Sequence, residues 1–143
     1  MPITQAMATS FKVSLLNGGQ NFSSNTFKLA LYTSSATINE NTTAYSSSNE
    51  VPSTGNYSAG GNTLSVSVTP TNSGNVAYIS FANTSWANST ITAAGALIYN
   101  NTNANSAVCV LSFGGDKTST NGTFAINFPT ADATNAIIRL TAS

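Results

Sequence analysis

The chain has 143 residues, the size of one ordinary domain, and a chain of this length buries roughly 68% of the surface that it exposes when unfolded. Only four residues are Lys or Arg and four are Asp or Glu, so charged residues make up 6% of the chain, where about 25% is usual. Ser, Thr and Asn, 61 of the 143 residues, supply the polar surface instead. The cations occur singly, at Lys12, Lys28, Lys117 and Arg139. We therefore expect neither nucleic-acid binding nor electrostatic membrane binding, since both need clustered Lys and Arg.

The sequence gives no sign of export or membrane insertion. Its longest uninterrupted apolar stretch, residues 93–99, is much shorter than the ~20 residues of a membrane-spanning helix. Residues 1–5 lack the basic and apolar regions of a secretory signal, so we expect synthesis in the cytoplasm. The single cysteine, Cys109, has no second cysteine with which to form an internal disulfide. A net charge of zero favours association, because charge repulsion does not keep the copies apart.

The N-terminal segment shows a helical period. Its apolar residues recur every fourth position, at Met7, Phe11 and Leu15. With Thr4 as the N-cap and Gly18 just beyond the last apolar residue, this spacing predicts a helix over residues 4–17. Phe11 is a candidate core residue. The helix is expected to pack on its own domain, and the alternative is that residues 1–19 attach to a neighbouring molecule.

The remainder of the chain has the two-residue period of β-strands. The first strand is predicted at residues 27–33, and a long polar loop follows at 34–62. Further strands are predicted at residues 64–68, 76–81, 95–99, 107–113, 124–128 and 136–141. Gly and Pro between the second and third strands indicate a hairpin, and a connection is expected over residues 114–122. The whole chain is thus predicted to be a single all-β domain, an antiparallel β-sandwich of jelly-roll or immunoglobulin-like type with one short N-terminal helix.

Few residues are suited to catalysis. The chain has no histidine, the usual general acid or base near neutral pH. Cys109 lies between two valines without a basic neighbour, so we interpret it as a small buried core residue rather than a nucleophile. The four carboxylates are far apart in sequence: Glu40, Glu50, Asp116 and Asp132. We therefore expect no enzyme activity, no metal site and no cofactor.

Aromatic residues offer a second possibility, because a Tyr or Trp ring stacks well beneath a sugar. Trp86 follows an apolar strand and precedes another apolar segment, so it is predicted to pack in the core. Tyr45 and Tyr57 lie in the long polar loop instead. These two tyrosines are the candidate interface or glycan contacts.

Several segments resemble, in the same order, the small structural proteins of tailed bacteriophages. The most specific is FANTSWANSTITA at residues 81–93, which continues as GALIYN at 95–100. The others are KLALYT at 28–33, NEV at 49–51, FGGDK at 113–117 and FPT at 128–130. The resemblance extends from about residue 5 to residue 140 and includes no catalytic motif.

This resemblance implies a virion component, made in the bacterial host cytoplasm. Capsid decoration, neck and tail-fibre roles are all compatible with it. The chain lacks the repeats of a fibre shaft, and its neutral surface suits close contact with other proteins. The leading expectation is a capsid decoration or cement protein that contacts the major capsid protein or other virion proteins and forms a homotrimer. The alternative is a neck- or tail-fibre module that binds a host-surface glycan.

Overall fold

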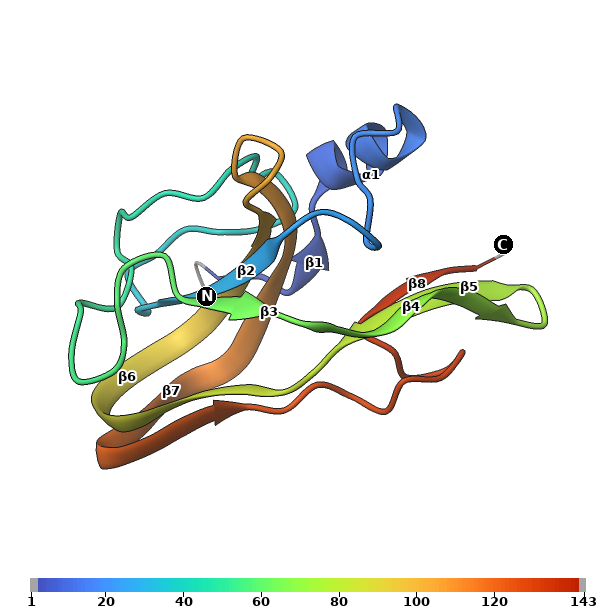
Figure 1. The fold of residues 1–143 in the computed structure, drawn as a ribbon. Helices are drawn as coiled ribbons and strands as arrows, with labels where there is room; N and C mark the ends of the chain where they lie inside the picture. Colours follow the sequence, from blue (N-terminus) through green and yellow to red (C-terminus); the bar gives the residue numbers. More distant parts are fainter. Residues whose placement is uncertain (1–2, 142–143) are drawn as a thin grey trace.

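A computed structural model describes residues 3–141 of the chain and has two antiparallel sheets packed together (Figure 1). The five-stranded sheet has the order β1-β7-β6-β2-β3, with β1 at Ala6–Met7, β2 at Phe27–Tyr32, β3 at Asn62–Leu64, β6 at Thr84–Asn100 and β7 at Ser106–Ile126. The three-stranded sheet has the order β4-β5-β8, with β4 at Val66–Ser73, β5 at Val76–Phe81 and β8 at Ile138–Leu140. The one helix of the described residues, α1, spans Thr9–Leu16. The expected antiparallel β-sandwich with a short N-terminal helix is therefore confirmed.

The hairpin of β6 and β7 is the longest element of the fold. Near the turn that joins the two strands, Ala96 pairs with Leu111 and Ile98 with Cys109. The apolar segments 95–99 and 107–113 therefore pair with each other, as expected. The strands then continue well past these segments, with bulges where the register shifts. The connection expected over residues 114–122 is therefore wrong, because these residues belong to β7 and Lys117 pairs with Ala93. Gly114, at a φ of 77°, belongs to a large irregular bulge between Ser112 and Lys117 and not to a turn that ends the strand.

The smaller sheet is built on the predicted hairpin. β4 and β5 pair antiparallel across a turn at Gly74, whose φ is 59°, a value that favours glycine. β8 adds to the other side of β5. This sheet extends away from the body at the right of Figure 1, below α1. The two sheets meet at Phe81 of β5, whose ring lies 5.9 Å from that of Phe27 in β2.

Helix α1 is shorter than predicted. Ala6 and Met7 pair with Val110 and Cys109 of β7, so they form a strand and not the first turn of the helix. The N-cap is Ala8 and not Thr4. The N–H of Thr9 has no acceptor within the helix and donates to the backbone oxygen of Glu40 at 2.8 Å. The predicted end is confirmed, because Gly18 has a φ of 75° and the next residue donates its N–H to Ser14.

The long loop is present as expected, since no strand or helix spans residues 33–61. It is held by isolated bridges such as Ile3 with Ile38 and Tyr32 with Glu50. The Val51 N–H also donates to the backbone oxygen of Leu31 at 2.9 Å. Residues 49–51 of the loop therefore lie along the end of β2.

The three residues proposed for the core are all buried. Phe11, Trp86 and Cys109 belong to the cluster of apolar side chains between the sheets, the helix and the loop. Trp86 lies within β6 and not beyond a strand end, and its ring packs 5.4 Å from that of Tyr57. Within residues 3–141, no helix has the length and apolar character that a membrane crossing needs.

Candidate functional site

Tyr45 and Tyr57, the two tyrosines singled out in the long loop, meet at one carboxylate. The Tyr45 hydroxyl donates to Oε1 of Glu50 at 2.5 Å, and the Tyr57 hydroxyl donates to Oε2 at 2.6 Å. The Gly60 N–H donates to the same Oε2 at 2.7 Å. Glu50 is only 9% exposed, so a buried carboxylate is satisfied by three donors from its own loop.

Two further tyrosines connect this cluster to the sheet. The Tyr99 hydroxyl, from β6, donates to the backbone oxygen of Gly60 at 2.7 Å. The Tyr32 hydroxyl, from β2, donates to the backbone oxygen of Ser46 at 2.6 Å. Burial raises the pKa of Tyr99 to about 12, and the negative charge of Glu50 acts in the same direction. Burial also raises the pKa of Tyr57 well above its ordinary value, as does its hydrogen bond to Glu50.

The tyrosine cluster holds the loop in place, and three of its four rings, those of Tyr32, Tyr57 and Tyr99, are buried. Tyr57 is 1% exposed, so its ring has no free face on which a sugar could stack. This corrects the expectation that Tyr57 is a surface contact. Tyr45 is partly buried, and its ring stacks on that of Tyr99 with centroids 4.7 Å apart. One face of the Tyr45 ring is therefore already occupied.

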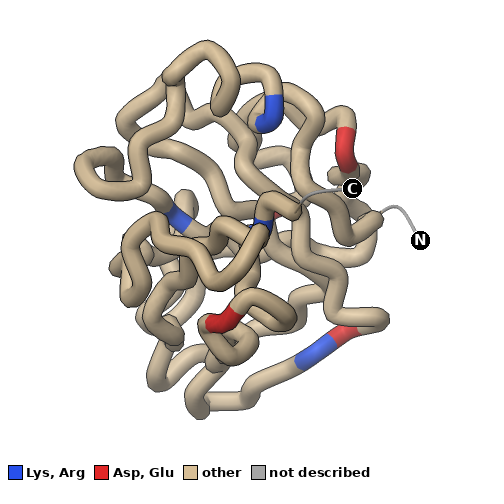
Figure 2. The backbone as a smooth tube through the Cα atoms, turned by 90° about the vertical axis from the view of Figure 1, so that its right-hand side faces the viewer, with Lys and Arg blue, Asp and Glu red and all other residues tan. Residues whose placement is uncertain are grey.

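The other carboxylates do not join this cluster. Glu40 is exposed beside the start of α1, and Asp116 is exposed on β7. Asp132 is half-buried, and hydrogen bonds from the side chain and backbone of Asn135 and from the backbone of Thr134 lower its pKa. Among the described residues, no group of three or more potential metal ligands occurs. Figure 2 shows the few charged residues spread singly over the backbone, apart from the adjacent pair Asp116 and Lys117.

Cys109 is placed where a thiol is least reactive. It is buried on β7, next to the edge strand β1, and burial raises the pKa of the thiol to about 12. The thiolate, which is the nucleophilic form, is therefore scarce at neutral pH. This placement agrees with the interpretation of Cys109 as a small core residue.

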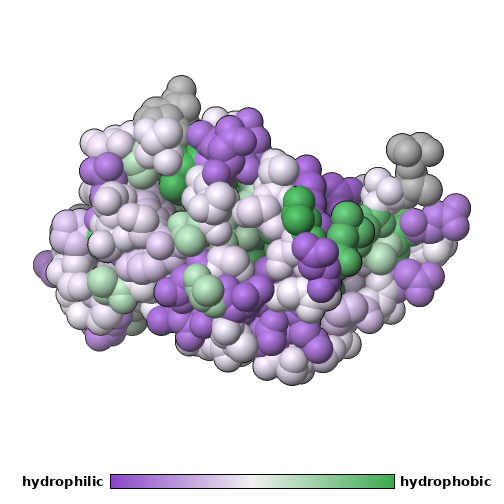
Figure 3. Space-filling model, turned by 90° about the horizontal axis from the view of Figure 1, so that it is seen from above, coloured by the Kyte–Doolittle hydropathy of each residue, from purple (hydrophilic) through white to green (hydrophobic). Residues whose placement is uncertain are grey.

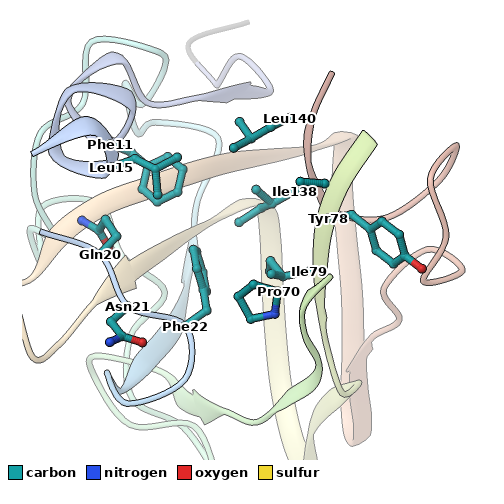
Figure 4. A pocket seen from close by; sticks show the side chains of 11 residues that line it. Phe11, Leu15, Gln20, Asn21, Phe22, Pro70, Tyr78, Ile79, Ile138 and Leu140 are labelled. Atoms are coloured by element: carbon teal, nitrogen blue, oxygen red, sulfur yellow. The ribbon is translucent and has the colours of Figure 1, made fainter. Parts of the chain in front are cut away.

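A second feature, an apolar groove beside α1, was not predicted from the sequence. It lies between the helix and the three-stranded sheet and has a volume of about 220 Å³. Its lining residues come from α1, the segment that follows it and strands β4, β5 and β8: Phe11, Leu15, Gln20, Asn21, Phe22, Pro70, Ala77, Tyr78, Ile79, Ile138 and Leu140 (Figure 4). None of these residues is charged. The groove is therefore suited to an apolar occupant.

Both features depend on contacts between distant parts of the chain. The apolar residues of the helical segment predicted that one face of the helix is buried. They did not predict that an apolar groove lies between this helix and the three-stranded sheet. The signal for the tyrosine cluster was the presence of Tyr45 and Tyr57 in one polar loop. Nothing in the sequence pattern of the loop indicates that Glu50 is their common partner.

Comparison with known proteins does not assign the chain to a family. No model of a known protein family, no curated protein and no solved structure matches it. The likeness of residues 81–93 and the accompanying segments to phage structural proteins therefore remains an expectation from the sequence.

Proposed function

We propose that this protein is a non-enzymatic structural component of a tailed-phage virion, a capsid decoration or cement protein. In this role it stabilises the shell by contacts with the major capsid protein or other virion proteins, and it does so as a homotrimer. The proposal rests on the resemblance of the sequence segments to phage structural proteins and on the character of the surface.

The distribution of charge carries the proposal. Between Glu50 and Asp116 the chain has no charged residue, and this stretch forms β3, β4, β5, β6 and the first part of β7. Covering a charged side chain in an interface requires that it be desolvated or paired, which costs several kcal/mol per ion. Ser, Thr and Asn side chains can instead exchange hydrogen bonds with water for hydrogen bonds with a neighbour. A surface of this kind favours permanent contact with other proteins.

The long loop adds a second supporting observation. It is polar and lacks regular structure, yet Glu50 holds its parts together through three hydrogen bonds. The hydroxyl of Tyr99, from β6, and the N–H of Leu31, from β2, then bond the loop to the sheet. A loop that is ordered before binding loses less conformational entropy when a partner covers it. Residues 33–61 therefore offer a preformed polar surface with which to contact neighbours in a shell.

The alternative, a neck- or tail-fibre module that binds a host-surface glycan, has less support. It depended on Tyr45 and Tyr57 as stacking platforms. Tyr57 is buried, and Tyr45 has one ring face against Tyr99. A host-glycan array separates the two functions: saturable binding that is lost in Tyr45→Ala would favour the fibre module, and the decoration function predicts no such binding.

The experiment that tests the proposal adds the purified protein to phage particles that lack it. We expect saturable binding to the shell and a higher temperature of particle disruption. Because the contacts are mainly uncharged, roughly 0.5 M salt, which shortens the Debye length to about 4 Å, should not release the protein. A protein that does not bind, or that salt alone releases, would contradict the proposal.

A further inference from the structure

Most of β7 forms an open edge of the five-stranded sheet. β6 pairs with one side of this strand, and β1 covers the other side only at Cys109 and Val110. Among the described residues, no strand pairs with the outer side of residues 111–126. An open edge has unpaired backbone N–H and C=O groups, to which a strand of another chain can add.

The rest of the surface does little to prevent such pairing. Charged residues, which keep copies apart when they share one sign, make up only 6% of the chain and balance to zero. The face shown in Figure 3 is mostly neutral to hydrophilic, with apolar residues gathered where the three-stranded sheet leaves the body. The groups at the edge itself therefore decide whether a second strand can add to β7.

Two side chains occupy backbone donors at the start of the open edge. The Ser112 N–H donates to Oε1 of Gln5 at 3.2 Å, and Gln5 directly precedes β1 on the outer side of β7. The Gly114 N–H donates to Oγ of Ser112 at 3.3 Å. These donors are therefore already satisfied within the chain, where a strand added to the edge would need them.

The strand is also irregular just beyond these bonds. Residues 113–116 of β7 lie opposite the single residue Ala94 of β6. Two of the four are Gly114 and Gly115, whose φ angles of 77° and 153° favour glycine. A bulge bends the strand and interrupts the regular row of backbone groups with which an added strand pairs.

The only two charged residues that are adjacent in the sequence lie at this bulge. Asp116 and Lys117 are both exposed, and no other charged residue occurs between Glu50 and Asp132. A strand added here would cover both charges, which would then have to be desolvated or paired. Bulges and charged side chains are two of the means by which natural sheets protect an open edge.

We propose that Gln5, the bulge at residues 113–116 and the charged pair of Asp116 and Lys117 together keep the edge of β7 from pairing with another chain. The three features act on the free protein and prevent edge-to-edge association of its copies. The inference does not depend on the proposed function, because it concerns the chain in solution and not its place on a particle.

The test variant combines Gln5→Ala, Asp116→Thr and Lys117→Thr. It removes the cap and the charged pair, keeps the net charge at zero and places strand-favouring residues at the edge. All three positions are exposed, so we expect the variant to fold, which its thermal unfolding midpoint checks. Sedimentation should show self-association at concentrations at least about tenfold lower than for the wild type. Hydrogen exchange should then be slower in residues 112–126. Asp116→Thr with Lys117→Thr alone should show the same change to a smaller extent.

The matched control combines Lys12→Gln and Glu40→Gln with Thr4→Ala, all at exposed positions away from the edge of β7. It also removes one cation and one anion, so the association should change by less than about twofold. Equal association of the two variants would overturn the inference, because the loss of charge and not the edge would then be the cause. A test variant that associates no more than the wild type, or whose association slows exchange only outside β7, would also overturn it. Binding to particles is a separate measurement, and it alone tests the proposed function.

Discussion

The Tyr57 hydroxyl donates a 2.6 Å hydrogen bond to Glu50 and accepts one of 2.9 Å from the N–H of Leu31. One buried side chain thus connects the carboxylate at the centre of the loop to the backbone of β2. Because Tyr45 and Gly60 donate to the same carboxylate, the position of the loop depends on the negative charge of Glu50.

Glu50→Gln should destabilise the protein by about 2 to 3 kcal/mol, because an amide nitrogen would then face a donor and a charge-assisted hydrogen bond would be lost. Glu40→Gln, a carboxylate in the same loop but exposed, should change stability by less than about 0.5 kcal/mol. Urea unfolding measures both, and hydrogen exchange should show faster exchange in residues 33–61 of Glu50→Gln. Equal stability of the two variants would mean that the carboxylate does not hold the loop.

Alanine substitutions at two glycines allow the cost of backbone strain to be distinguished from the cost of a steric collision. Gly61 and Gly18 have φ angles of 77° and 75°, so alanine is strained at both. A Cβ on Gly61 would collide with the backbone oxygen of Leu29, whereas a Cβ on Gly18 would meet no atom within 4 Å. Gly18→Ala should therefore cost roughly 1 to 2 kcal/mol, and Gly61→Ala clearly more, as seen in thermal unfolding. A similar loss in both variants would show that β2 and the end of the loop are not in close contact.

The two faces of α1 should respond differently to truncation. Phe11→Ala should cost about 3 to 5 kcal/mol, because the side chain is fully buried and leaves a cavity. Val13→Ala, on the exposed face, should change the unfolding free energy by less than about 0.5 kcal/mol.

Deletion of residues 1–19 tests the packing of the helix on its own domain. The deletion removes Ile3, Ala8 and Phe11 from the core and β1 from the sheet, so the remaining chain should not unfold cooperatively. A soluble remnant that melts cooperatively and no longer binds particles would make this segment an attachment device instead.

Alkaline pH should destabilise the fold. The pKa of Tyr99 is raised from 10.0 to about 12 and that of Cys109 from 9.0 to about 12, so both groups hold their protons more tightly when folded. The stability that these groups contribute is fully present below the unfolded pKa values. It is lost as the pH rises from about 9 toward 12, where the unfolded chain binds fewer protons. Urea unfolding at pH 8 and pH 11 should show this loss of stability, and the loss should be smaller in Tyr99→Phe. If the wild type is equally stable at both pH values, the pKa values of Tyr99 and Cys109 are not raised by folding.

Local periodicity predicted the elements whose pattern is set by neighbouring residues. The alternation at Phe27–Tyr32 and Val76–Phe81 identified β2 and β5, and Gly74 identified the hairpin turn. These signals sufficed because alternate side chains of a strand lie on the same face of the sheet and because each turn is short.

Long-range pairing accounts for what the sequence did not predict. Ala6 pairs with Val110, which is more than a hundred residues away, and therefore forms a strand. The helix for this reason begins later than the spacing of the apolar residues suggests. Gly114 has the local character of a turn, yet β6 holds the strand on both sides of it. Glu50 gains its role only when Tyr57 and Gly60 fold back onto it. None of these partners has a regular spacing in the sequence.

Electron cryomicroscopy of intact particles that contain this protein tests its proposed role most directly. The account predicts density for this fold on the outside of the capsid shell, in three-fold clusters that contact the major capsid protein. Density only in the neck or tail, or no density on the particle, would contradict it.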